Sequence, residues 1–469
     1  DGAVETIINV LRYFDIEFDE GAGFDDTDPR NAYGPYFQRQ RVEIYHTYAK
    51  SLVERGLAYP CFCTEEELDK VRAKQEEDKV LTGYYGEYAT CRNLSYEEVE
   101  ANIKAGKPYV LRLRSQGSPD KEITFVDAIK GEIKLPENIH DIVLLKKDGI
   151  PTYHFAHAID DHLMRTTTVV RGGEWLASAP IHYELFHLLG FKMPAYAHTA
   201  HLMKFDEETG GKRKLSKRKD PELSLDYYRK DGYHPYTMKV YLLTLLNSNF
   251  EEWHEKFPDK DINEFPFSVE KMNQSGALFD KDKLHNICKN ELSKLSEEEL
   301  YDFLYDWAKE NEPENVEKWF GDREKMLQIL RLYMGVGAKR RRKDLMYAKQ
   351  IFELISYFFD GESAEEMDEF KLDEDMVSKI LKSYLAKYDH NDDNSVWFNK
   401  LKEIADEHGF ASDMKAYKAN PENFKGNVSD IAEAVRIAVT GRANTPDLWT
   451  IVHIMGEEQM TERIKKHIK

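Results

Sequence analysis

Residues 149–189 read GIPTYHFAHAIDDHLM and then RTTTVVRGGEWLASAPIHYELFHLL, and this stretch indicates the fold. Thr166–Val170 is a β-branched run typical of a strand. Ser178 is a suitable N-cap for a helix that we expect to end at Gly190. A second strand is expected at Ala197–Met203. Strand, helix and strand in this order predict one βαβ half of a doubly wound α/β fold.

A basic run follows this unit. Residues 212–220 read KRKLSKRKD, and six of the eight residues from Lys212 to Lys219 are cationic in a chain of formal net charge -20. Taken alone, such a run is most simply a solvated loop. Ammonium groups on a loop can also stabilise negative charge that accumulates on phosphates in a transition state. The context around the run decides between these two interpretations.

The centre of the run, Lys214-Leu215-Ser216-Lys217, resembles the Lys-Met-Ser-Lys-Ser loop of class I aminoacyl-tRNA synthetases. Residues 149–189 add to this, and the chain is similar to the bacterial glutamyl-tRNA synthetases from about Ile7 onwards. Two further stretches carry the resemblance: YGPYFQRQR at residues 33–41 and TGRANTPDL at residues 440–448.

Composition limits the class of protein. The 469 residues are long for one domain, and about three to five domains are expected. Charged residues make up 32% of the chain, and we find neither a run of about 18 apolar residues nor a signal-peptide pattern. Four cysteines in so long a chain do not form a disulfide framework. These features predict a soluble cytoplasmic protein with no membrane span.

The predicted fold class is α/β at the front and helical at the back, because strand-like runs fade beyond Asp220. The resemblance implies a Rossmann-type catalytic domain interrupted by an inserted α/β domain that packs against the tRNA acceptor end. All-α stem-contact and anticodon-binding domains then follow. We expect the catalytic domain at 1–63 and 151–220, the insertion at 64–150, the stem-contact domain at 221–290, and the anticodon-binding domain in two parts, 291–375 and 376–469.

Members of the family carry an N-terminal strand and a His-Ile-Gly-His loop ahead of a segment like this one. We find no such motif in the sequence, which starts at Asp1 without a methionine. We therefore expect further residues upstream of Asp1, carrying half of the expected ATP site.

Three residues are candidates for binding the amino acid. Pro151 begins a helical pattern that places Tyr153 and His157, four residues apart, on one face. Arg171 ends the β-branched run, at the edge where open α/β sheets bind ligands. Its guanidinium can hold a carboxylate through two hydrogen bonds and so separate glutamate from glutamine. A structural pair and a surface salt bridge are the alternatives, but the resemblance implies that Tyr153, His157 and Arg171 bind L-glutamate, although many members have Asn at the position of His157.

The resemblance also implies an ATP site. Glu174 and Trp175 take positions that lie near the adenosine in the family, and Met203 is expected to meet the adenine by backbone contact. Lys217 is assigned both to ATP binding and to catalysis. ATP and Mg²⁺ are the expected cofactors.

The catalytic candidates are Lys214, Ser216 and Lys217. The charges of the two lysines would neutralise the migrating phosphates and would form no covalent bond. No Ser or Cys nucleophile is needed, because the carboxylate of the substrate attacks the α-phosphate.

Cys61, Cys63 and Cys91 raise the question of a metal, because some relatives bind zinc with C-x-C, a distal Cys and a His. Asn93 stands where the fourth ligand would be, and Tyr88 is a poor substitute. We therefore predict structural thiols and no metal.

The back of the chain holds candidates for RNA contact. Arg436, Thr445, Pro446 and Leu448 match positions that touch anticodon bases in bacterial relatives. By itself the Thr-Pro segment is most simply a turn between helices. An acidic chain must hold RNA through local basic patches, and Lys339–Lys343 (KRRRK) is a second such patch beside the run at residues 212–220.

The expected function is ATP-dependent charging of tRNA(Glu) with L-glutamate by a monomer, in two steps through glutamyl-adenylate. Two alternatives stay open. A glutaminyl-tRNA synthetase is the nearest, but such enzymes usually carry β-barrel anticodon domains, whereas the back of this chain is helical. A catalytically inactive tRNA-binding homologue is the other, and the intact KLSK run argues against it.

Overall fold

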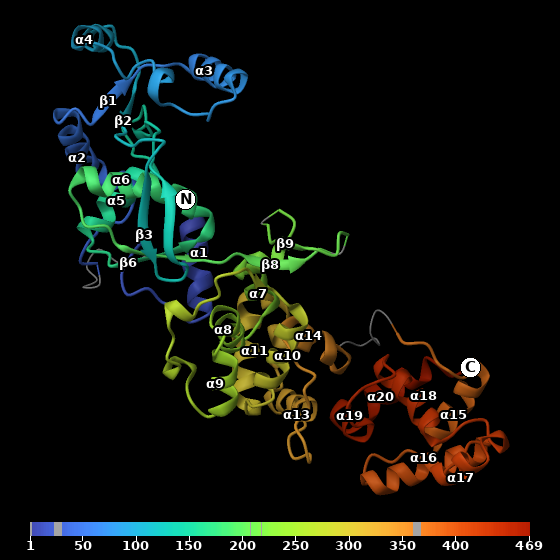
Figure 1. The fold of residues 1–469 in the computed structure, drawn as a ribbon. Coiled ribbons are helices and arrows are strands. Elements are labelled where there is room, and N and C mark those ends of the chain that lie inside the picture. Colours follow the sequence, from blue (N-terminus) through green and yellow to red (C-terminus); the bar gives the residue numbers. More distant parts are fainter. Residues whose placement is uncertain (1, 23–30, 207, 217, 360–366) are drawn as a thin grey trace. The chain divides into compact units, whose positions relative to one another are not determined.

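The computed structural model describes residues 2–22, 31–206, 208–216, 218–359 and 367–469. The chain divides into two compact units, and Figure 1 labels their helices and strands. The first unit is Asp1–Asp220 with Leu242–Phe279, and the second is Pro221–Tyr241 with Asp280–Lys469. Among the described residues, no helix is long and apolar enough to cross a membrane.

A four-stranded sheet in the order β4-β3-β7-β6 forms the centre of the first unit. β3 (Glu122–Asp127) and β4 (Gly131–Pro136) are an antiparallel pair, and β6 (Thr168–Gly172) and β7 (Ala195–Thr199) are parallel. β3 joins the two pairs, because Asp127 is paired with Tyr196 of β7 in parallel register. This pairing places the end of β3 next to the start of β7.

The expected βαβ half is confirmed by the parallel pairing of β6 and β7 around α6 (Ala179–Leu189). Gly190 ends α6 with a φ of 73°, a left-handed conformation that glycine adopts without strain. The prediction for Ser178 is only partly correct: it stands at the N-cap position, but its side chain makes no capping bond. The reason is the 3-10 turn Gly173–Ser178, which runs directly into α6 and leaves Ser178 in a helical conformation.

Helix α5 (Tyr153–Leu163) begins two residues after Pro151, where the helical pattern was expected to start. Its inward face carries Phe155 and Ile159, both fully buried. They belong to one core cluster with residues of α2 (Val42–Glu54) and α6, which fixes α5 against these two helices.

Two of the stretches that carry the family resemblance meet at Asp160 of α5. Arg41, the last residue of 33–41, is 3% exposed and donates its Nε–H to Asp160 Oδ1 at 2.9 Å. Tyr45 donates its hydroxyl to Asp160 Oδ2 at 2.6 Å. The segment before α2 is thereby tied to the helix that carries Tyr153 and His157.

The expected inserted domain, residues 64–150, contributes strands to two different sheets. β2 (Val110–Leu113) pairs with β1 (Ala58–Cys61) and with β5 (Val143–Leu145). β3 and β4, by contrast, extend the sheet of β6 and β7. α3 (Glu65–Asp78) begins with a capping box at Thr64. α4 (Tyr96–Lys104) begins with a second capping box at Ser95.

The single strand expected over 197–203 is wrong in one respect, because it is broken into two. β7 ends at Thr199, and β8 (Leu202–Phe205) belongs to another sheet of the first unit, in the order β10-β8-β9. β9 (Lys212–Lys214) is the start of the basic run, and β10 (Ala277–Leu278) pairs with β8 in parallel. After this break the chain leaves the central sheet and enters the β8–β9 hairpin.

The second unit is helical, as expected. One continuous core cluster extends from Leu292 to Ile464. Its helices are α7 (Leu225–Asp231), α10 (Lys281–Leu292), α11 (Glu297–Asn311), α12 (Val316–Phe320), α13 (Arg323–Met334), α14 (Ala348–Ile355), α15 (Glu374–Lys387), α16 (Asn394–His408), α17 (Met414–Ala419), α18 (Val428–Thr440), α19 (Leu448–Met455) and α20 (Glu457–Lys465). The remaining helices are α1 (Gly2–Tyr13) and α9 (Phe250–Lys256) in the first unit, and α8 (Pro235–Leu246), which runs from one unit into the other.

Candidate active site

Arg171 lies near the end of β6, directly opposite His198 of β7 in the register of the two strands. Its side chain is 9% exposed. The Nε–H is donated to Nε2 of His198 at 3.0 Å, and Nη1 is donated to Nδ1 of His182 at 2.9 Å. Two imidazoles from β7 and α6 therefore hold the guanidinium on two sides.

These contacts fix the protons on both rings, because a guanidinium only donates hydrogen bonds. His198 accepts at Nε2, so its proton is on Nδ1, which lies 2.6 Å from Asp127 Oδ2. His182 accepts at Nδ1, so its proton is on Nε2, which lies 2.9 Å from His154 Nδ1. The result is a hydrogen-bonded row from Asp127 through His198, Arg171 and His182 to His154.

Burial keeps these rings neutral. It lowers the pKa of His182 to about 2, with His157 and Arg171 adding repulsion, and it also lowers the pKa of His154 and of His198. Burial opposes ionisation of Asp127, but hydrogen bonds from the backbone N–H of Lys130 and from His198 outweigh it and lower the pKa of this carboxyl. Asp127 is thus anionic, the imidazoles are neutral, and Arg171 is the cation of the row.

The guanidinium has one face on an aromatic ring. Its carbon lies 4.4 Å above the centroid of Tyr196, whose hydroxyl is 2.8 Å from His157 Nε2. Nη2 reaches the carbonyl oxygen of Trp175 at 3.5 Å. Among the described residues, no carboxylate pairs with Arg171. Its charge is therefore available to an anionic ligand.

The structure brings the three predicted amino-acid contacts together. The rings of Tyr153 and His157 stack at 5.6 Å with 11° between their planes, and the Tyr153 ring lies 4.5 Å from that of Trp175. Tyr153 is 46% exposed, whereas His157 is buried, with its Nδ1 2.7 Å from Asp161 Oδ2. Polar and aromatic side chains thus cluster here, and Tyr196 connects them to Arg171 because it contacts both His157 and the guanidinium.

Glu174 lies on the 3-10 turn after β6, and its carboxylate is 3.4 Å from His201 Nδ1. The turn passes close to the end of β7, because a Cβ on Gly173 would lie 3.1 Å from the carbonyl oxygen of Thr199. Glu174 and Trp175 thus sit at the carboxyl ends of β6 and β7, the ligand-binding edge of such sheets.

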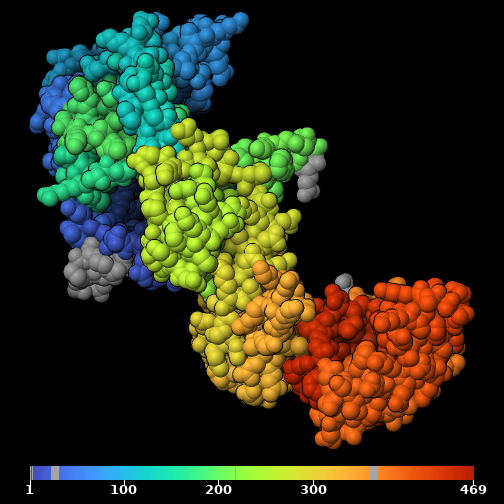
Figure 2. Space-filling model, turned by 60° about the horizontal axis from the view of Figure 1, so that its bottom comes forward, coloured from blue at the N-terminus to red at the C-terminus, as the bar shows by residue number. Residues whose placement is uncertain are grey.

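Met203 and Lys214 are paired residues of β8 and β9. β10 holds Met203 from the other side, because Leu278 is its strand partner and the N–H of Phe279 is donated to its carbonyl oxygen at 2.7 Å. The predicted adenine contact and the first predicted catalytic lysine are therefore neighbours on one hairpin, which stands out in green in Figure 2.

Asp220 organises the basic run from its end. It is 1% exposed and accepts hydrogen bonds from both terminal nitrogens of Arg213 at 2.7 Å and from the backbone N–H of Ser216 at 2.8 Å. The Arg213 guanidinium holds the pKa of this carboxyl well below its usual range. Leu215 is buried, while Lys214 is exposed. Arg213 is therefore a structural cation, and Lys214 points its charge to solvent.

Lys217, assigned to catalysis and to ATP, lies outside the described residues. Its neighbours on either side are Ser216, which is partly buried, and Arg218, which is exposed. Its predicted role stays a prediction.

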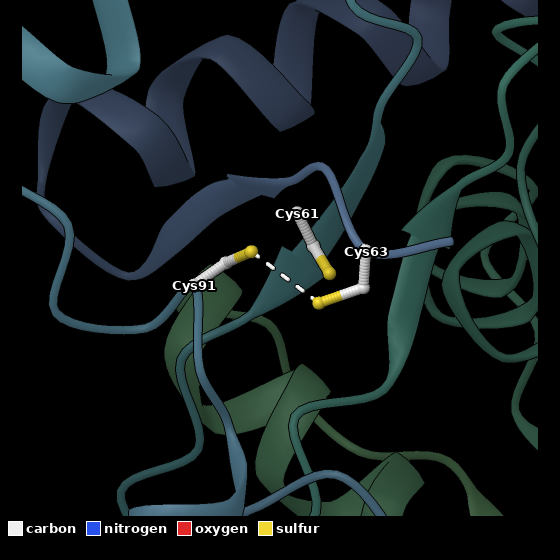
Figure 3. A group of neighbouring side chains, drawn as sticks. All are labelled: Cys61, Cys63 and Cys91. Atoms are coloured by element: carbon white, nitrogen blue, oxygen red, sulfur yellow. Dashed lines mark hydrogen bonds between the residues drawn. The ribbon is translucent and has the colours of Figure 1, made fainter. Parts of the chain in front are cut away.

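Three cysteine sulfurs gather at the end of β1, as Figure 3 shows. The sulfurs of Cys61, Cys63 and Cys91 lie within 4.8 Å of one another, and those of Cys63 and Cys91 are 3.5 Å apart. The hydroxyl of Tyr84 is 3.4 Å from Cys61 Sγ and 3.3 Å from Cys63 Sγ. Tyr88, the tyrosine considered from the sequence, instead contacts Asp78. The three thiols are ligands of the kind that a tetrahedral zinc ion takes, whereas a tyrosine hydroxyl is not among its usual ligands. The absence of a metal stays a prediction.

In the second unit, Arg436 lies on α18 and donates Nη1–H to the carbonyl oxygen of Ala443 at 3.3 Å. Burial lowers the pKa of this arginine. Thr445 donates its hydroxyl to the carbonyl oxygen of Pro446 at 3.0 Å. Leu448 begins α19 with its side chain 3% exposed in the core, so any contact it makes with a base would use its backbone.

A cavity of about 670 Å³ opens beside this turn. Its lining includes Pro446 and His453 on one side and three arginines, Arg331, Arg340 and Arg342, on the other. The basic run 339–343 returns close to the end of α13, where a Cβ on Gly335 would lie 2.9 Å from Arg342 Cγ. The structure thus brings the second basic patch next to Pro446, a proximity that the sequence did not reveal.

The sequence missed four members of the row around Arg171: Asp127, His154, His182 and His198. Two weak signals were present. Asp127 ends a strand whose burial alternates, and His182 lies on the face of α6 that carries Leu185 and Phe186. Neither signal indicates that the two residues lie on either side of one arginine.

Comparisons with known proteins agree with this geometry. Residues 1–286 match the family described as tRNA synthetases class I (E and Q), catalytic domain, and residues 299–468 match an anticodon binding domain. A glutamate–tRNA ligase of Acetivibrio thermocellus is 53% identical over 468 residues, which are 99% of this chain and 84% of the relative. One from Clostridium perfringens (strain SM101 / Type A) is 45% identical over 473 residues, covering 100% of this chain and 85% of the relative.

A solved structure is also similar. The crystal structure of a glutamate tRNA ligase from Elizabethkingia meningosepticum in complex with its amino acid matches with a TM-score of 0.72 at 26% identity. The match covers 99% of this chain and 89% of that one.

Proposed function

The chain belongs to the class I tRNA synthetases (E and Q), and from this we propose that it joins L-glutamate to tRNA(Glu) with ATP. The family resemblance expected from residues 149–189 and 212–220 is confirmed, and so is the α/β class with a helical back. Membership also makes the chain an ATP-using ligase.

The observation that carries the choice of amino acid is the state of Arg171. Its guanidinium is buried, is held by two neutral imidazoles and has no carboxylate partner among the described residues. A cation in this state favours an amino acid with a side-chain carboxylate, since glutamate and glutamine differ by that charge. This feature supports glutamate over the glutamine alternative.

The reaction has two steps. An oxygen of the glutamate α-carboxylate attacks the α-phosphorus of ATP, and the bond to pyrophosphate breaks. A hydroxyl of the terminal ribose of tRNA then attacks the activated carbonyl, and AMP leaves. The side-chain carboxylate is held by Arg171, with Tyr153 and His157 beside it.

Other residues serve the nucleotide in this proposal. Glu174, Trp175 and the backbone of Met203 contact the adenosine, and Mg²⁺ enters with ATP as part of the nucleotide substrate. Lys214, Ser216 and Lys217 stabilise the negative charge that grows on the phosphates as pyrophosphate departs.

The second unit binds the anticodon arm in this proposal. Arg436, Thr445, Pro446 and Leu448 line the reading surface, and the arginine-rich cavity beside Pro446 supports this role because it is large enough for a nucleotide base and carries cations for phosphate. We further propose that the protein acts as a monomer in the cytoplasm, with the domain limits expected from the sequence.

The test is a charging assay with the full-length protein. Transcripts of tRNA(Glu) and of tRNA(Gln) are each incubated with ATP and labelled glutamate or labelled glutamine, and labelled tRNA is measured. We expect glutamate to be attached and glutamine not. Attachment of glutamine alone would make the chain a glutaminyl-tRNA synthetase, and tight tRNA binding with no charging of either would make it an inactive homologue.

A further inference from the structure

His182 and His198 contact Arg171 in a way that side-chain packing alone does not require. Both are fully buried, and each turns an unprotonated ring nitrogen to the guanidinium, at 2.9 and 3.0 Å. Buried arginines are usually paired with carboxylates, which satisfy the N–H groups and neutralise the charge. Here three of the five N–H groups have neutral acceptors among the described residues, and the charge is not neutralised.

The difference matters for an anionic ligand. A carboxylate partner would compete with the ligand's carboxylate for the same guanidinium, whereas a neutral acceptor fixes its position and leaves its charge in place. An uncompensated buried cation is unfavourable, and a ligand that brings a negative charge removes this cost. A neutral ligand of the same shape leaves the charge of the guanidinium uncompensated.

The ends of the row keep the rings in this state. Asp127 is held by the backbone N–H groups of Ile129 and Lys130 at 3.0 and 2.9 Å, and it accepts the Nδ1–H of His198. The negative charge nearest along the row is therefore separated from Arg171 by one imidazole ring. On the other side, His154 accepts from His182.

We propose that His182 and His198 are positioning residues that make the amino-acid site selective for a charged side chain, by holding Arg171 through neutral acceptors. The proposal rests on the proposed function. It assigns to two histidines, and to Asp127 behind one of them, a share in separating glutamate from glutamine.

The test compares two substitutions of His182 that have nearly the same shape and differ in charge. His182→Glu places a carboxylate at Arg171, and His182→Gln keeps a neutral acceptor there. His187 on the same helix is exposed and provides matched controls, His187→Glu and His187→Gln. ATP–pyrophosphate exchange with tRNA(Glu) present gives KM for glutamate and for ATP, and the ratio of kcat/KM for glutamate over glutamine.

For His182→Glu we expect KM for glutamate to rise about 30-fold or more, with KM for ATP unchanged and the ratio for glutamate over glutamine reduced. His182→Gln should stay within about threefold of the wild type, and both His187 variants should match it. If His182→Glu binds glutamate as well as His182→Gln does, or if KM for ATP rises equally, the proposal is wrong.

A second variant covers failure of His182→Glu to fold, which thermal melting would reveal. Asp127→Asn removes the charge that fixes the proton of His198 on Nδ1 and lets the ring present Nε2–H to Arg171. We expect KM for glutamate to rise about tenfold, with kcat nearly unchanged; an unchanged KM would overturn the proposal. Pyrophosphate exchange by the wild type tests the proposed function separately from the role of the histidines. If the wild type shows no glutamate-dependent exchange, the proposed function is wrong. If it does, the variants test the role of the histidines alone.

Discussion

Two cationic regions of the first unit hold their charge in opposite ways. Arg171 is buried, and two imidazoles, Tyr196 and the carbonyl of Trp175 fix it in place. The basic run 212–220 leaves Lys214 in solvent and ties Arg213 to Asp220. The first arrangement suits a charge that is present throughout the reaction, and the second suits a charge that develops during it.

The kinetic consequence follows from when each charge is needed. The side-chain carboxylate of glutamate is charged in the ground state and in the transition state, so an interaction with Arg171 affects KM. Phosphate charge grows as pyrophosphate leaves, so the amines of the basic run affect kcat. Substitutions in the two regions should therefore separate KM from kcat.

The largest effect is expected for Arg171→Ala. A ligand carboxylate that loses its buried partner is destabilised by several kcal/mol as an order of magnitude, so KM for glutamate should rise about 10²-fold or more while KM for ATP stays nearly constant. ATP–pyrophosphate exchange at varied glutamate and ATP measures both constants. A loss of ATP affinity with normal glutamate affinity would reverse the assignment of the two half-sites.

Lys217→Ala should lower the rate of adenylate formation about 10²-fold, with little change in KM for glutamate, because its charge is needed mainly as pyrophosphate departs. Pyrophosphate exchange at saturating glutamate and ATP measures this rate. Lys212→Ala in the same run is the control: Lys212 is exposed, 5.9 Å from the ring centroid of Phe205, and its removal should have little effect. Unchanged exchange in Lys217→Ala would remove this residue from the mechanism.

Arg436→Ala extends the comparison to a third, half-buried cation in the second unit. Loss of one base contact costs about 1–3 kcal/mol, so kcat/KM for charging tRNA(Glu) should fall about ten- to hundredfold. Glutamate activation at saturating tRNA should remain as in the wild type. Transcripts with native and altered anticodons provide the measurement, and a variant that discriminates the altered anticodon as strongly as the wild type shows that Arg436 reads no base.

The smallest effect concerns pH. His154, His182 and His198 have lowered pKa values, so they stay neutral as pH falls from 8 to 6, and KM for glutamate should change by less than about twofold over that range. The steady-state constant at pH 8, 7 and 6 is the measurement. A rise in KM that follows an ionisation near pH 6.5 would show that a row histidine becomes charged.

The same histidines affect folding stability in a defined direction. The unfolded chain binds protons on them below about pH 6.5, whereas the folded chain does not until their lower pKa values are reached. Their contribution to the free energy of unfolding therefore falls as pH drops below about 6.5. Replacing His182 with Gln should make the melting temperature less dependent on pH between 6.5 and 5 than in the wild type.

Local patterns in the sequence were sufficient for much of the fold. The helix ending at Gly190, the capping box at Thr64 and the helices of the second unit depend on residues within a few positions of one another. The break after Thr199 was not predictable, because neither Gly nor Pro marks it and the change of sheet depends on β9 and β10.

A residue of the candidate site was predictable only where its own position in the sequence indicated a role, as the position of Arg171 at the end of a strand did. The row around Arg171 depends on β3 reaching β7, a pairing between residues far apart in the sequence. Nothing local marks Asp127 as the partner of His198, and nothing local indicates that Tyr84 lies nearer the three thiols than Tyr88.

The most direct measurement is ATP–pyrophosphate exchange by the full-length protein with tRNA(Glu) present, comparing glutamate with glutamine. If the uncompensated charge of Arg171 selects the amino acid, kcat/KM for glutamate should exceed that for glutamine by about 10³-fold or more. Exchange of similar efficiency with the two amino acids would contradict the central claim that a fixed, unpaired cation defines this site.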